Sequence, residues 1–184
     1  MHYLDLVQDT ERRKNETKEA RDFLCIDRLY LMIRKYEPEI VIETGVRFGY
    51  STTAILKALE DNKRGHLYSI EYNKNGVGQL IPETLKERWT LILGDSLKEL
   101  PKLVQRLGSV DFFFHDSNHA YEHQCQEFSI VYPYVGPGWF ITADDWSFGG
   151  KWPLSDFAAE RGEQISCLSI KPRFGVIQKR DPNA

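Results

Sequence analysis

One stretch, residues 40–53, constrains the fold of this chain more than any other. An apolar run at 40–42 leads into a loop that carries Gly45 and Gly49, and an amphipathic segment starts near Ser51. This order predicts a strand, a tight turn and a helix. Glycine permits a positive φ in such a turn and lets the backbone approach a ligand closely. The first amides of the helix would point a partial positive charge at the loop, so a carboxylate or phosphate could bind there.

The spacing of the glycines separates this loop from a well-known alternative. Gly45 and Gly49 form Gly-x-x-x-Gly, whereas dinucleotide-binding enzymes carry Gly-x-Gly-x-x-Gly. The spacing therefore disfavours a nicotinamide-dependent oxidoreductase. By itself it is also compatible with an ordinary strand-to-helix turn that binds nothing.

Composition narrows the class of protein. The 184 residues are 41% hydrophobic and 28% charged, which is ordinary for one soluble globular domain. The net charge of −3 does not indicate a nucleic-acid surface. Three widely spaced cysteines form no CxxC pair, and we find no secretory signal and no apolar run long enough to span a membrane. We expect a cytoplasmic protein without nucleic-acid or membrane partners, and we leave assembly into a homo-oligomer open.

Hydrophobic periodicity predicts alternating strands and helices. Residues 1–37 read as a polar arm and one helix, and residues 38–184 as a Rossmann-like domain, so the chain forms a single domain overall. Alternation predicts an α/β fold, a doubly wound seven-stranded sheet that is mostly parallel, with helices on both faces. A hairpin at the end predicts an antiparallel C-terminal strand, added at the edge. The expected strands are 40–44, 66–70, 89–93, 110–115, 139–143, 164–170 and 174–179.

Acidic side chains end nearly every one of the parallel strands. In a doubly wound sheet, ligands bind beyond the carboxyl ends of the strands. Acids also begin turns and cap helices, so each one alone has a structural explanation. The set consists of Glu43, Glu71, Asp95, Asp116, Asp144 and Asp145.

These positions suit an adenosine with a short charged tail. Glu71 is placed where an acid can accept both ribose hydroxyls. Asp95 and Ser96, one strand further along, would lie near the base, and the tail would lie on the loop from Gly45 to Ser51.

The pattern resembles the class I S-adenosylmethionine-dependent methyltransferases, most closely the small-molecule O-methyltransferase branch. The resemblance covers roughly residues 38–180, and the terminal hairpin matches that fold. It implies S-adenosylmethionine as cofactor and a small-molecule acceptor with a hydroxyl group. The resemblance is carried by residues 43–52, 70–71 and 94–96. The candidate cofactor contacts are Glu43, Gly45, Gly49, Ser51, Glu71, Asp95, Ser96 and Asp116.

A second group of residues predicts how the acceptor would react. Asp116 follows one strand, and Asp144 and Asp145 follow its neighbour. Three carboxylates suit Mg²⁺ or Mn²⁺, which could orient the acceptor hydroxyl and lower its pKa. His119 could then take the proton as general base. We expect His115 and the histidine at position 123 to be structural.

This group is similar to metal-dependent O-methyltransferases of the catechol and macrolide-sugar types. The catechol type has a lysine where this chain has His119, and the sugar-modifying type and its cephalosporin-pathway relatives have histidine. Those relatives more often carry Glu-Asp where this chain has Asp144 and Asp145. The shorter first side chain makes a looser site or a metal-free site an alternative.

We therefore expect an S-adenosylmethionine-dependent O-methyltransferase. The alternatives are a non-catalytic S-adenosylmethionine-binding domain and, with less support, a nicotinamide-dependent oxidoreductase. The identity of the acceptor does not follow from the sequence.

Overall fold

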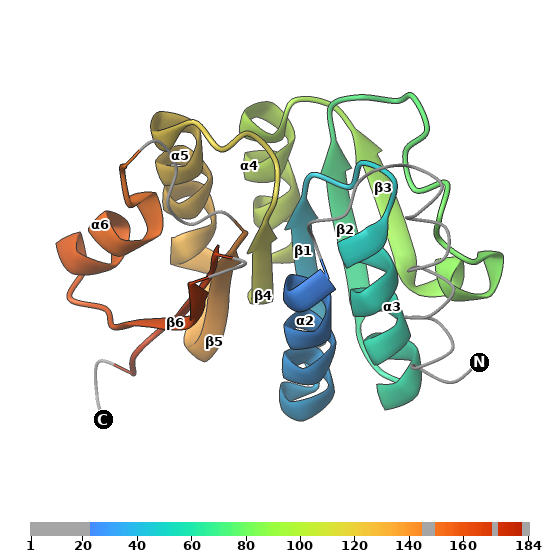
Figure 1. Ribbon diagram of the computed structural model, residues 1–184, viewed down its shortest axis with the longest axis horizontal. Coiled ribbons are helices and arrows are strands. Elements are labelled where there is room, and N and C mark those ends of the chain that lie inside the picture. The colour runs from blue at the N-terminus through green and yellow to red at the C-terminus, as the bar shows by residue number, and fades with distance from the viewer. Residues whose placement is uncertain (1–22, 145–149, 171–172, 182–184) are drawn as a thin grey trace.

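The computed structural model describes residues 23–144, 150–170 and 173–181 (Figure 1). Within these residues the strands form a seven-stranded sheet in the order β3-β2-β1-β4-β5-β7-β6. The strands are β1 (Ile40–Thr44), β2 (His66–Glu71), β3 (Trp89–Leu93), β4 (Val110–His115), β5 (Val135–Ala143), β6 (Ile165–Ile170) and β7 (Arg173–Gln178). The first five are parallel, which confirms the predicted doubly wound sheet.

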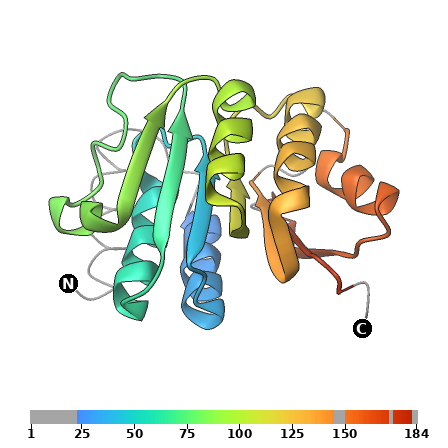
Figure 2. The same ribbon diagram turned by 180° about the vertical axis from the view of Figure 1, so that it is seen from behind.

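Helices cover both faces of the sheet, as predicted. Helices α2 (Phe23–Tyr36) and α3 (Tyr50–Asn62) lie in front of the sheet in Figure 1. Helices α4 (Ser96–Leu107) and α5 (Tyr121–Val131) lie in front in the reverse view of Figure 2, with α6 (Pro153–Glu160) beside α5. Two short 3₁₀ segments, Glu83–Arg88 and Tyr132–Tyr134, precede β3 and β5.

The two-residue period of the strands divides the core between these faces. On β4, Phe112 and Phe114 join the core under α2 and α3, whereas Phe113 joins the core under α4, α5 and α6. All three phenylalanines are fully buried. A strand covered on both sides carries apolar side chains on both of its faces, as the three phenylalanines of β4 do.

The C-terminal hairpin differs from the prediction in its order. We expected the antiparallel strand at the edge, but β7 lies between β5 and β6 and is antiparallel to both. Phe174, Val176 and Ile177 of β7 are buried, whereas Ser166 of β6 is exposed. The order follows from strand pairing: β7 turns back from β6 and pairs with β5 between Phe140 and Ala143, which leaves β6 at the edge.

Asp95 is the N-cap of α4, and its side chain accepts a hydrogen bond from the amide of Leu97 at 3.1 Å. The Ser96 hydroxyl donates to the carboxylate of Glu127.

In the described part of the chain, none of the helices is both long enough and apolar enough to span a bilayer.

Candidate active site

The loop between β1 and α3 is held by close backbone contacts at the carboxyl end of the sheet. Gly45 has φ 86°, and a Cβ atom built there would lie 2.1 Å from the carbonyl oxygen of Asp116. Gly49, the N-cap of α3, has φ 95°, and a Cβ there would lie 2.6 Å from Ile81. Both glycines are therefore required by space as well as by conformation. Gly49 packs on Ile81 and supports the loop from outside the cavities described next.

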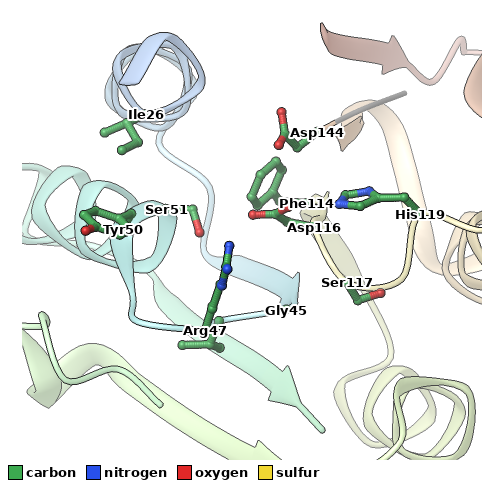
Figure 3. Close-up of a pocket in the computed structure, with 11 residues that line it drawn as sticks. Ile26, Gly45, Arg47, Tyr50, Ser51, Phe114, Asp116, Ser117, His119 and Asp144 are labelled. Carbon is green, nitrogen blue, oxygen red and sulfur yellow. Dashed lines mark ion pairs between the residues drawn. The ribbon is translucent and has the colours of Figure 1, made fainter. Parts of the chain in front are cut away.

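Two adjoining cavities lie around this loop. The first has a volume of about 360 Å³ and the second about 570 Å³, and they share Gly45, Arg47, Asp116 and Ser117. The first is also lined by Ile26, Val46, Tyr50, Ser51, Phe114, His119 and Asp144 (Figure 3). The second is also lined by Ile70, Glu71, Tyr72, Gly94, Asp95, Ser96, Leu97, Asn118 and His123.

Glu71 connects the second cavity to the loop. Its Oε2 accepts hydrogen bonds from the amides of Val46 and Arg47, each at 2.8 Å, and its Oε1 accepts one from Asn73 at 2.7 Å. A carboxylate has about four acceptor positions, so Glu71 can still accept from a ligand. Asp95 and Ser96 line the same cavity. The structure thus brings Glu71, Asp95 and Ser96 together as predicted.

Glu43 lies beneath the loop rather than in a cavity. It is fully buried, and its carboxylate accepts hydrogen bonds from Ser51 at 2.6 Å, Ser69 at 2.7 Å and Thr52 at 2.8 Å. Burial raises the pKa of Glu43 to about 7, and these hydrogen bonds only partly oppose the rise. The predicted contact between Glu43 and a cofactor has no support in this geometry. Its position instead suits a support for the first turn of α3.

Asp116, His119 and Asp144 converge on the first cavity, as the sequence predicted. Asp116 follows β4 and Asp144 follows β5, and the His119 ring extends toward them (Figure 3). The Nε2 atom of His119 lies 3.9 Å from Oδ1 of Asp116. The amides of Asp116 and Asp144 donate to the carbonyls of Thr44 and His115, which fixes both acids to neighbouring strands.

The predicted metal site is only partly described. Asp145, its third carboxylate, lies outside the described residues. Among residues 23–144, 150–170 and 173–181, no three acidic, histidine or cysteine side chains are grouped closely enough to hold a metal ion. Asp116 and Asp144 alone make an incomplete set of oxygen ligands.

Arg47 is a candidate binding residue that our sequence reasoning missed. It lines both cavities, and Figure 3 shows its side chain directed between Ser51 and Asp116. Its φ of 50° is uncommon for a residue other than glycine and is retained because Glu71 binds its amide and Gly78 donates to its carbonyl. The signal in the sequence was a cationic side chain inside a glycine loop expected to bind an anion.

A buried carboxylate behind the second cavity was missed as well. Glu127 of α5 is fully buried. Burial alone would raise its pKa, but hydrogen bonds from His115 and His123 outweigh that effect and hold the pKa of Glu127 far below its usual range. Position 127 follows a polar run and looks solvent-exposed in the sequence, so only the fold reveals it. Both histidines that we expected to be structural bind this carboxylate.

A family model described as a methyltransferase domain matches residues 42–146, more than half of the chain. This protein belongs to that methyltransferase family. The matched residues contain the glycine loop, Glu71, Asp95, Asp116 and His119. No curated protein matches the methyltransferase in sequence.

Solved structures share the fold of this methyltransferase. A putative caffeoyl-CoA O-methyltransferase from Staphylococcus aureus is 17% identical with a TM-score of 0.73, over 94% of this chain and 91% of the other. An O-methyltransferase from Bacillus cereus in complex with SAH is 17% identical with a TM-score of 0.71, over 95% and 91%. CalS11, a TDP-rhamnose 3'-O-methyltransferase of calicheamicin biosynthesis, is 18% identical with a TM-score of 0.68, over 87% and 79%.

Proposed function

We propose that this methyltransferase transfers a methyl group from S-adenosylmethionine to a hydroxyl group of a small molecule. The observation that carries the proposal is the pair of cavities joined at Gly45 and Arg47. The second cavity offers groups that suit a nucleoside, and the first is lined by a histidine and two acids. A cofactor lying across the junction would present its reactive end to the first cavity.

The residues present fit the cofactor at three points. Glu71 offers carboxylate oxygens to the ribose hydroxyls in the second cavity. Gly45 has no side chain, so the backbone after β4 can come close and Asp116 lies at the junction of the two cavities. Arg47 and the N-terminus of the 13-residue helix α3 can hold the carboxylate of the methionine tail. When bound, S-adenosylmethionine supplies a methyl group on a positively charged sulfur.

His119 is the general base in this proposal. An imidazole with an ordinary pKa near neutrality can take a proton from a hydroxyl group at working pH. Asp116, with Oδ1 at 3.9 Å from Nε2 of His119, would stabilise the positive charge that the ring gains. Methyl transfer needs little further help from the protein beyond orientation of the two reactants.

A divalent metal held by Asp116, Asp144 and Asp145 extends the proposal. Such an ion would orient the acceptor hydroxyl and lower its pKa. Asp116 and Asp144 line the first cavity, which supports this extension, and Asp145 lies outside the described residues.

Ligand-dependent unfolding tests the cofactor, and a methylation assay tests the chemistry. S-Adenosylhomocysteine (SAH), the demethylated product of the cofactor, should raise the unfolding temperature of the protein, whereas NAD should not. Radiolabelled methyl transfer to a panel of hydroxylated small molecules should then occur with wild type and fall at least about a hundredfold in His119→Ala. Binding of SAH with no transfer to any acceptor would favour a non-catalytic binding domain. Stabilisation by NAD alone would favour an oxidoreductase and overturn the proposal.

A further inference from the structure

The two carboxylate oxygens of Glu127 face different surroundings. Oε2 accepts hydrogen bonds from Thr44 at 2.6 Å and from His115 at 2.7 Å, and both donors are fully buried. Oε1 lies within hydrogen-bonding distance of Ser96 at 2.5 Å, Ser117 at 2.8 Å and His123 at 2.9 Å. The three partners of Oε1 line the second cavity. Glu127 therefore acts on the cavity wall without facing the cavity itself.

The charge of Glu127 determines which atoms carry the protons. Its depressed pKa keeps it ionised, and a carboxylate has no proton to give. Each of the short contacts to Oε1 must then contain a proton from its partner. A serine hydroxyl has one proton, so Ser96 and Ser117 have only lone pairs left to offer a ligand. The Nε2 atom of His123 lies 2.9 Å from Oε1 and 3.1 Å from the Ser96 hydroxyl, so a proton on it is directed at these same oxygens and takes no proton from the serines.

We propose that Glu127 is a specificity-determining residue, which makes Ser96 and Ser117 hydrogen-bond acceptors and so selects a purine that carries an amino group at position 6. The inference rests on the proposed function, because it concerns the base of the cofactor. Neutral adenine has donors only on its 6-amino group, and its ring nitrogens accept. A 6-oxo purine presents a carbonyl oxygen in that place, so two acceptors would face each other.

Two acids that line the second cavity, Asp95 and Glu71, are less able to select between the two purines, because both are already engaged by other groups. Asp95 has Oδ1 bonded to the amide of Leu97 and Oδ2 at 3.5 Å from Lys98. Its carboxylate is thus partly engaged by α4. Glu71 accepts from the amides of the loop, and its remaining acceptor position is assigned to the ribose. By contrast, Ser96 and Ser117 can only accept hydrogen bonds from a ligand, because both hydroxyls donate their protons to the buried carboxylate of Glu127.

The test compares two ligands that differ in this one group. Calorimetry would measure the binding of SAH and of its 6-oxo analogue, S-inosylhomocysteine, to wild type and to Glu127→Gln. A buried polar group left without a partner costs enough that wild type should prefer SAH by at least about tenfold. In Glu127→Gln the replacement amide can itself donate, the hydroxyls can turn, and the ratio of the two dissociation constants should fall at least about threefold.

Two further variants separate selection from folding. Thr44→Val removes a donor to Oε2 only, so it should lower the unfolding temperature and leave the ratio as in wild type. Ser96→Ala removes one of the accepting oxygens and should lower the ratio, which keeps the inference testable if Glu127→Gln does not fold. An unchanged ratio in Glu127→Gln, or in Ser96→Ala if that variant must replace it, would overturn the inference. Failure of wild type to bind SAH at all would instead overturn the proposed function.

Discussion

Glu43 shows how a single buried side chain connects the loop to the sheet. Its three hydroxyl donors come from α3 and β2, and none of its surface is exposed. A carboxylate buried in this way keeps its proton to a higher pH than in the unfolded chain. The position predicts a dependence of stability on pH.

Stability should fall as pH rises from about 4.5 to about 7, the unfolded and folded pKa values of Glu43. Within this window the native state binds a proton that the unfolded state has lost, so raising the pH favours unfolding. Glu43→Gln cannot titrate. Urea unfolding should show the variant gaining on wild type by on the order of 1–3 kcal/mol between pH 5 and pH 8. A difference between the two proteins that is independent of pH would show that Glu43 is ionised at pH 5.

Arg47 lies where its guanidinium can bind the methionine tail of the cofactor. A guanidinium bound to the methionine carboxylate contributes a charge-assisted hydrogen bond, so Arg47→Ala should weaken SAH binding by about tenfold. Methylthioadenosine lacks the amino-acid tail, and its affinity should change less than about twofold. Arg47→Lys should recover part of the loss. Equal weakening of both ligands in calorimetry would mean that the variant disturbs the loop instead.

The element that organises the site is the unit of β1, loop and α3. Gly45→Ala would place a methyl group against the Asp116 backbone at a positive φ. We expect it to destabilise the fold by about 1–3 kcal/mol and to abolish SAH binding. Gly108→Ala is the matched control, because Gly108 has φ 77° and open space around its Cβ position. It should cost about 1 kcal/mol and leave SAH binding unchanged. Equal losses of stability and of SAH binding in both variants would show that the close approach of the Asp116 backbone to Gly45 is not what the site requires.

Most elements of the sheet could be predicted from the sequence because each carries a local signal. The apolar runs of β1, β2 and β4, and the acids at their ends, depend only on neighbouring residues. The order of β6 and β7 could not be predicted, because it depends on which of them pairs with β5, a strand distant in the sequence. The same holds for Glu127, because two of its five hydrogen-bond partners, Thr44 and Ser96, lie 83 and 31 residues away in the sequence. Asp116 and His119 were found because a turn after a strand places them together.

At the scale of the whole molecule, the two halves of the sheet supply different parts of the site. Strands β2 and β3 lead to Glu71 and Ser96, whereas β4 and β5 lead to Asp116, His119 and Asp144. The halves meet at β1 and β4, where the strand order reverses. Doubly wound sheets bind their ligands at this point. The sites that we propose for the nucleoside and the acceptor therefore lie on opposite sides of one loop.

Removal of metal ions tests whether a divalent ion takes part in methyl transfer. If Asp116, Asp144 and Asp145 hold a divalent ion, EDTA should lower the methylation rate at least about tenfold, and Mg²⁺ should restore it. Asp144→Asn should lose the response to Mg²⁺ while keeping its affinity for SAH within about twofold, since Asp144 lines the first cavity only. A rate unaffected by EDTA would show the metal prediction to be wrong and leave His119 as the base.

The most direct measurement is a crystal structure of the protein with SAH. We expect the ribose hydroxyls within hydrogen-bonding distance of Glu71, the base beside Ser96, and the sulfur at the junction of the cavities facing His119. SAH bound elsewhere, or with its sulfur turned away from the first cavity, would contradict the proposed function.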